Sequence, residues 1–234
     1  MPQKTPSVQN LIVGTTNPTF AGARDATSGT VFTAPGGAAA TTHPQAIKYS
    51  KVAGARGNSF NINRYFLEFD TSDISVTPAD ATLRIPGSTN ATADFFAVKA
   101  TFSDGSLANG DFDAIDGWTA GADNSSNVTK YSSEVTSWST SGNNDITLTS
   151  DALSDMASED NFKICLIQSD NDLANVEATV VVSTGVNLLN SLRLDYTAGS
   201  SGYTNNVLGV ASANIASVNG VATANIASVN GSDT

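Results

Sequence analysis

Three aspartates lie close together in the segment GDFDAIDGW and could supply ligands to a cation. Asp111, Asp113 and Asp116 carry carboxylate oxygens, which are the ligands that Ca²⁺ takes from protein loops. Asp170 and Asp172 form a second pair in another turn-rich segment. Neither segment matches the pattern of an EF-hand loop. We therefore set a calcium site against a simpler interpretation, in which these residues form solvated acidic turns.

Three large aromatic residues could bind a sugar. Trp118, Tyr131 and Trp138 lie in a polar stretch that is rich in Ser and Asn, where flat rings could stack on a glycan. Large aromatic residues also serve as core or inter-sheet packing, because each buries a large apolar area. The sequence leaves both interpretations open.

Residues that carry catalysis are sparse. His43 is the only histidine and has no second His or Cys nearby, so no zinc site is predicted. Cys165 is the only cysteine, which excludes an internal disulfide and predicts a buried, small apolar side chain. The chain has no Gly-x-Ser-x-Gly turn and no phosphate-binding loop. We therefore expect a protein that is not an enzyme and needs no cofactor.

Charge is distributed unevenly along the chain, whose net charge is −11. Residues 1–64 carry +5 and the remainder carries −16. An acidic body argues against nucleic acid or an anionic membrane as the main partner. The basic residues of the N-terminal part could clamp an acidic neighbour, or they could balance the acidic body within one fold.

The sequence also bears on where the protein works. The first residues, MPQKTPSVQNLIVG, lack the apolar run of a signal peptide. No stretch approaches the roughly 18 apolar residues that would span a bilayer. We expect synthesis in the cytoplasm, without membrane insertion.

The elements that must position these residues are β-strands. Several runs alternate apolar side chains with a period of two, which predicts strands with one buried face. They are Tyr65/Leu67/Phe69, Phe96/Val98/Ala100/Phe102, Phe162/Ile164/Leu166, Val176/Ala178/Val180/Val182 and Leu192/Leu194/Tyr196. Only residues 149–158 have a helical pattern, with Thr149 or Ser150 as N-cap. The predicted fold is all-β: an antiparallel β-sandwich or jelly roll with one short helix.

Polar residues within this framework have structural interpretations. Asp70, in the segment Asp70-Thr71-Ser72, is expected to end a strand by accepting hydrogen bonds from its own turn. Arg64 and Arg84 are expected to pair with acids on neighbouring strands.

The C-terminal end repeats itself. VLGVASANIAS, from Val207, is followed by VNGVATANIAS and then by VNG, and nine of eleven positions are identical between the first two copies. Such short-period repetition indicates one structural unit used several times. Seven β-branched residues recur along it: Val207, Val210, Ile215, Val218, Val221, Ile226 and Val229.

Two conformations of this repeat remain open. On a helix, all seven β-branched residues would form one stripe. Val, Ile, Asn and Gly are poor helix formers, however, and Asn-Gly is a strong turn signal. The alternative is a series of short pieces broken at Gly209, Gly220 and Gly231. Either form buries little apolar surface alone, so the repeat predicts attachment to a partner surface.

A family resemblance supports this division of the chain. The segments INRYFLEFDTSDI, ATLRI and FFAVKATF resemble a jelly-roll domain with the pattern Arg-x-x-Leu-x-Phe-Asp-Thr-Ser-x-Ile, followed by Ala-Thr-Leu-Arg-Leu. GDFDAIDGW matches the acidic stretch of that domain, and SLRLDYT is similar to its last strand. The domain occurs in surface-anchored bacterial proteins and in virion proteins of tailed bacteriophages, and its architecture is similar to that of carbohydrate-binding modules. The C-terminal units resemble repeats at the ends of bacteriophage structural proteins.

The resemblance implies an organisation and a role. We expect an N-terminal extension at residues 1–29, a jelly roll at 30–197 and an assembly arm at 198–234. The expected function is that of a virion structural protein, such as a capsid decoration or fibre protein, whose partners are other virion proteins and copies of itself. The alternative is an adhesive module that binds a host-surface glycan.

Overall fold

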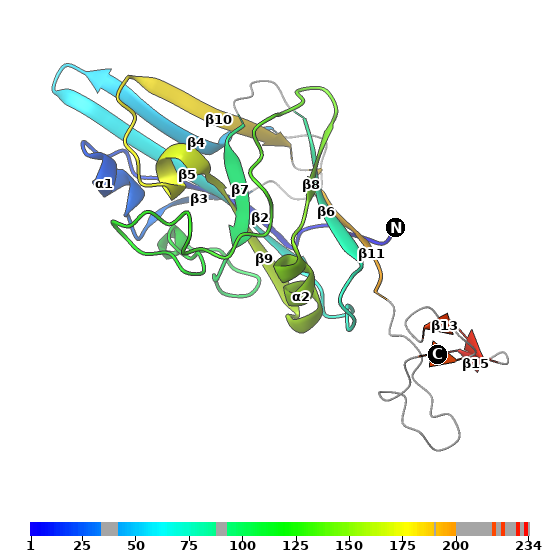
Figure 1. Ribbon diagram of the computed structural model, residues 1–234. Coiled ribbons are helices and arrows are strands. Elements are labelled where there is room, and N and C mark those ends of the chain that lie inside the picture. The colour runs from blue at the N-terminus through cyan, green and yellow to red at the C-terminus, as the bar shows by residue number, and fades with distance from the viewer. Residues whose placement is uncertain are drawn as a thin grey trace.

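The computed structural model describes residues 1–33, 42–87, 93–189 and 191–199, together with four two-residue strands closer to the C-terminus. Two antiparallel sheets pack face to face as a β-sandwich, which confirms the predicted fold class (Figure 1). Within the described residues, no helix is both long enough and apolar enough to cross a bilayer.

The larger sheet is built around one long strand, β5 (Gly57–Asp70). Its first half pairs with β4, its second half pairs with β9, and β2 lies along its other side. The other strands of this sheet are β2 (Val8–Gly14), β3 (Gly29–Thr33), β4 (Thr42–Gly54), β7 (Phe95–Lys99), β9 (Asn161–Gln168) and β10 (Val182–Leu189).

The smaller sheet contains both the first and the last strand of the sandwich. Its order is β1 (Gln3–Lys4), β11 (Arg193–Thr197), β6 (Asp80–Pro86) and β8 (Asn143–Thr147). Gln3 pairs with Asp195, so the first and last strands of the sandwich are neighbours. In the described chain β8 pairs only with β6, which makes β8 an edge strand.

Both faces of β5 are buried, which corrects the expectation of one buried face per strand. Tyr65, Leu67 and Phe69 point into the sandwich core, the cluster between the two sheets. Phe66 points to the opposite side and belongs to a second cluster, which we call the outer core. The larger sheet is therefore the middle layer of three.

Loops and short helices cover the outer core. Phe102 and Phe112 from the loops, Phe20 from α1 and Leu173 from η2 pack there against Phe66 and Cys165 of the sheet. The elements in this layer are α1 (Phe20–Arg24), the 3₁₀ turn η1 (Asn109–Asp111) and the π turn η2 (Ser169–Leu173). The sequence predicted only the longer helix, α2 (Ser150–Ser158), which begins after the N-cap Thr149 as expected.

Two predicted boundaries are wrong. Residues 1–29 are not an extension, because β1 and β2 are strands of the two sheets and β2 pairs with both β3 and β5. The run Val176–Val182 is not a strand: β10 begins only at Val182, and Val176 and Val180 are more than half exposed. Alternating apolar residues therefore did not mark a buried strand here.

Other residue-level predictions are confirmed. Asp70 accepts hydrogen bonds from the backbone N and the hydroxyl of Ser72. Arg84 pairs with Asp145 and Asp195 on the two neighbouring strands. Cys165 is fully buried, and this burial raises the pKa of its thiol.

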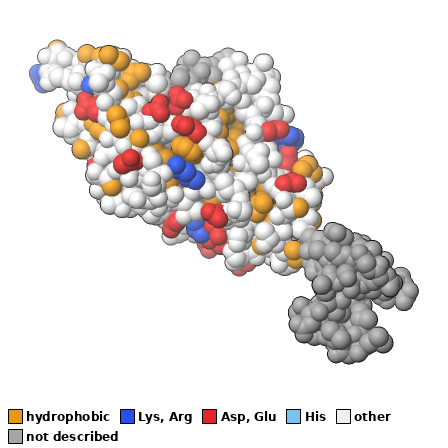
Figure 2. All heavy atoms as spheres, viewed as in Figure 1, with side chains coloured by type: hydrophobic (Ala, Val, Ile, Leu, Met, Phe, Trp, Pro, Cys, Tyr) orange, Lys and Arg blue, Asp and Glu red, His pale blue; other side chains and the backbone are white. Residues whose placement is uncertain are grey.

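Ion pairs connect the basic N-terminal part to the acidic body. Lys4 pairs with Asp73, Lys51 with Glu177, and Arg64 with Asp172. On the face in Figure 2, basic and acidic side chains lie interspersed. These contacts favour charge balance within one fold over a clamp on an acidic neighbour.

Candidate functional site

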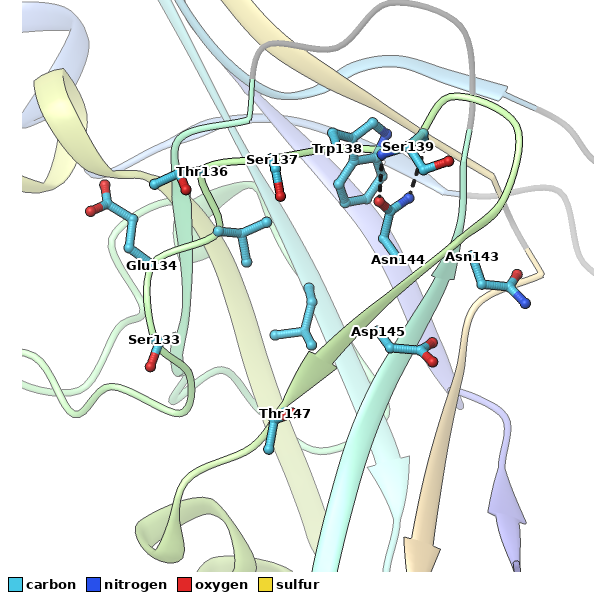
Figure 3. A pocket seen from close by; sticks show the side chains of 12 residues that line it. Ser133, Glu134, Thr136, Ser137, Trp138, Ser139, Asn143, Asn144, Asp145 and Thr147 are labelled. Atoms are coloured by element: carbon cyan, nitrogen blue, oxygen red, sulfur yellow. Dashed lines mark hydrogen bonds between the residues drawn. The ribbon is translucent and has the colours of Figure 1, made fainter.

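Among the described residues, a hollow of about 740 Å³ opens beside β8 and offers a candidate binding site. Residues 133–139 form one wall and residues 143–147 form the other (Figure 3). We call this hollow the β8 groove. Ser, Thr and Asn side chains dominate its lining, together with Glu134, Asp145 and Trp138.

Hydrogen bonds hold the two walls together at both ends of the groove. At one end Ser132 and Leu148 form an isolated bridge, and Thr149 N donates to Tyr131 O over 2.9 Å. At the other end the Asn144 side chain clamps Ser139 (Figure 3). Its Oδ1 accepts from Ser139 N at 2.7 Å, and its Nδ2 donates to Ser139 O at 3.0 Å. The groove is thus a framed slot between two stretches of backbone.

Trp138 connects the groove to the sandwich core. Its ring meets Phe95 edge-on, with 5.8 Å between the ring centroids, and its indole packs against the core cluster. The Nε1 atom is buried and has no hydrogen-bond partner among the described residues. A buried indole N–H usually finds a partner. Because the N–H of Trp138 has no such partner among the described residues, packing holds this side chain in place.

The charged side chains of the groove make it acidic. Asp145 accepts hydrogen bonds from Arg84 Nε at 2.6 Å and from Arg84 Nη2 at 2.7 Å. These bonds lower the pKa of Asp145, so it stays a carboxylate at neutral pH. An ionised carboxylate is a poor proton donor, and both of its oxygens already accept hydrogen bonds from Arg84.

The predicted glycan-binding residues do not form one platform. Tyr131 is fully buried and stacks on Phe162, with 5.0 Å between the ring centroids, so it offers no face to a sugar. Trp118 packs against the outer core, whereas Trp138 packs against the sandwich core. The larger sheet separates them. Trp138 alone lines the groove.

The predicted calcium ligands do not converge. Asp111 accepts from Ala108 N at 2.7 Å and so caps the turn η1. Asp116 accepts from the hydroxyl of Thr129 at 2.7 Å. In the parts of the chain that the structure describes, no group of three or more His, Cys, Asp or Glu side chains, Asp113 included, could hold a metal ion.

A buried ionic cluster was missed by the sequence prediction. Arg64 donates to both carboxylate oxygens of Asp172, at 2.8 and 2.7 Å, and to the backbone oxygens of Phe112 and Arg24. Its guanidinium carbon lies 4.1 Å from the centroid of the Trp118 ring. Arg64 was expected to pair along the sheet, but its partner comes from η2. An arginine inside an apolar strand was the one available signal.

The predicted assembly residues fall mostly outside the described residues. Val207, Val210, Ile215 and Ile226 lie wholly outside them. Val218, Val221 and Val229 lie in short strands whose backbone alone is described: β12 (Ser217–Val218), β13 (Val221–Ala222), β14 (Ser228–Val229) and β15 (Ser232–Asp233). β12 pairs with β13 and β14 pairs with β15, each across an Asn-Gly dipeptide in the sequence. These pieces are extended, so a continuous helix through them is wrong.

The groove offers polar groups, one partly buried aromatic ring and a carboxylate already paired with arginine. The buried cluster around Arg64 is closed to solvent. No protein-family model matches the chain, and no curated protein matches it either.

Proposed function

We propose that the chain is a non-enzymatic virion structural protein of a tailed bacteriophage, a capsid decoration or fibre protein. The β-sandwich is its exposed body, and residues 198–234, the arm, attach it to other virion proteins or to further copies. One observation carries the proposal. Strand β11 is the last strand of the sandwich in the sequence and ends at Thr197. The described strands of the arm pair only with each other. Folding and attachment are thus assigned to different parts of the chain.

The composition of the arm supports attachment through burial. Between Thr197 and Thr234 the only charged residue is Asp233, whereas seven β-branched residues recur along the repeat. Each Val or Ile that becomes fully buried contributes roughly 1.5–3 kcal/mol. Part of this gain offsets the entropy lost on ordering the arm. Attachment of this kind depends little on ionic strength, unlike attachment through surface charges.

The test compares the full chain with a chain that ends at Thr197. Incorporation into purified particles is measured at low and at high salt, with the fold of both chains checked by circular dichroism. We expect the full chain to attach at both salt concentrations and the truncated chain to remain free. Equal incorporation of both chains would mean that the arm is not the anchor.

A glycan-binding adhesive module is the second candidate, and the β8 groove favours it. The groove has the polar lining of a sugar site and Trp138 on its surface. This candidate requires specific retention on a glycan array, lost when Glu134 or Asn143 is changed to alanine. Both side chains are exposed, so these variants leave the core intact, whereas Trp138→Ala would also disturb the packing against Phe95.

A further inference from the structure

The outer edge of β8 turns backbone hydrogen-bonding groups toward the groove. Leu148 N donates to Ala81 O at 3.0 Å, in register with the pairing of β8 and β6. Antiparallel strands alternate between residues that bond to their partner and residues that face away. Ile146 and Asn144 therefore bond to β6. Asp145, between them, directs its N–H and C=O into the groove, and so do Asn143 and Thr147.

The opposite wall offers a similar set of groups. Val135 bonds to Phe95 through both of its backbone groups, at 2.9 and 3.3 Å. Its neighbours Glu134 and Thr136 line the groove, and in an extended segment adjacent residues turn their backbone groups to opposite sides. An extended peptide in the groove could pair with β8 along one edge and find further donors and acceptors along the other. This is the geometry of recognition by β-strand addition.

We propose that the β8 groove binds one extended repeat from the arm of a second copy of the chain, by strand addition to β8. This inference rests on the proposed function, in which the arm attaches to neighbouring molecules. Between the two closed ends of the groove, β8 offers the backbone of Asp145 to Thr147, so two or three residues of an 11-residue repeat would pair there.

The chemistry of the arm fits the groove. Its described segments are extended and contain valine, a residue that favours strands. The repeat is uncharged, so Glu134, Asp145 and the acidic body do not repel it. They would repel an acidic peptide. The described strands of the chain's own arm pair with one another and not with β8.

The main test uses a proline at the centre of the groove in the full chain. Asp145→Pro removes the N–H that faces the groove and the side-chain bonds with Arg84, but it leaves the backbone bonds to β6 intact, because proline is tolerated where an edge strand faces outward. Asp145→Asn is the matched control, since it loses the same charge but keeps the N–H. Sedimentation velocity over a range of concentrations measures self-association. We expect Asp145→Asn to associate like the unchanged chain and Asp145→Pro to associate roughly tenfold more weakly or worse.

A second measurement needs no variant. A synthetic peptide of residues 218–229 should dissociate the unchanged chain, whereas a scrambled peptide of the same composition should not. Hydrogen exchange at the amides of Asp145 and Thr147 should slow as the protein concentration rises. If Asp145→Pro fails to fold, Thr147→Pro against Thr147→Val repeats the comparison at the end of β8.

The possible failures differ from one another. Equal association of Asp145→Pro and Asp145→Asn, with no effect of the peptide, would overturn the groove inference but leave attachment through the arm intact. Amides that are protected at every concentration in a monomer would show that the chain's own arm occupies the groove, which also overturns the inference. A full chain that enters particles no better than the truncated chain would instead defeat the proposed function.

Discussion

Arg64 and Asp172 are both completely buried, and each depends on the other. Removing two charges from water is costly, and the structure offsets this cost with two hydrogen bonds between the side chains and with backbone oxygens that accept from Arg64. The cluster ties β5 to η2 and to the loop around Phe112. Its role is to hold the outer layer on the sheet.

Asp172→Asn tests this role. The change keeps the shape of the side chain but leaves the Arg64 guanidinium as an unpaired buried charge, which costs about 3–5 kcal/mol of unfolding free energy. The control is Asp145→Asn, which breaks an ion pair whose aspartate side chain is 47% exposed and should cost about 1 kcal/mol or less. Urea denaturation measures both. A loss for Asp172→Asn no larger than that of the control would contradict a stabilising role for the buried pair.

At the scale of elements, the sequence predicted the strands whose apolar residues alternate without interruption. β5, β9 and β11 belong to this class, and so does α2 with its Thr149 cap. β2 was missed because Leu11 and Ile12 are adjacent and both buried, as expected of a strand that is covered on both faces. Alternation records the burial of one face, so it does not identify a strand such as β2, in which adjacent residues are both apolar and both buried.

The candidate site was harder to predict than the strands. Trp138 was identified as a possible binding residue, but the groove depends on β8 lying opposite residues 133–139 without pairing to them. The partners of an edge strand are set by contacts distant in sequence. The local sequence pattern can therefore identify side chains of such a site, but it does not predict which segments form the walls.

Two truncations from the N-terminus distinguish the contributions of β1 and β2, the strands that lie within the predicted extension. A chain beginning at Ser7 loses the two residue pairs between β1 and β11, the hydrogen bond from Tyr196 N to Pro2 O and the Lys4–Asp73 ion pair, and it should remain folded. A chain beginning at Thr15 also loses β2, whose Leu11 and Ile12 are buried and which lies between β5 and β3, and it should not fold. Soluble yield and resistance to limited proteolysis measure the difference. Equal resistance of the two chains would make β2 dispensable.

At the scale of the whole molecule, the two hydrophobic cores share their central strands. β5 and β9 contribute side chains to the sandwich core from one face and to the outer core from the other. If β5 or β9 unfolds, both cores lose side chains at the same time. We therefore expect one cooperative unfolding transition for the sandwich, in spite of its three layers.

The two tryptophans can report on the two cores separately. Trp118 packs against the outer core and Trp138 against the sandwich core, and the chain has no other tryptophan. In Trp138→Phe, fluorescence follows the outer core alone, and in Trp118→Phe it follows the sandwich core. Within each variant, the fluorescence and circular dichroism transitions in urea should coincide. A fluorescence transition that precedes loss of secondary structure in either variant would mean that its core melts independently.

The pairing of β1 with β11 has a practical consequence for presenting foreign peptides. Tyr196 N donates to Pro2 O at 3.2 Å, so the N-terminus lies beside the point where the arm begins. The exposed turn between β4 and β5 lies at the opposite end of the molecule (Figure 1). If the arm holds the protein on a particle, an epitope fused before Met1 would face the particle surface. The same epitope placed between Gly54 and Gly57 would point outward, toward an antibody.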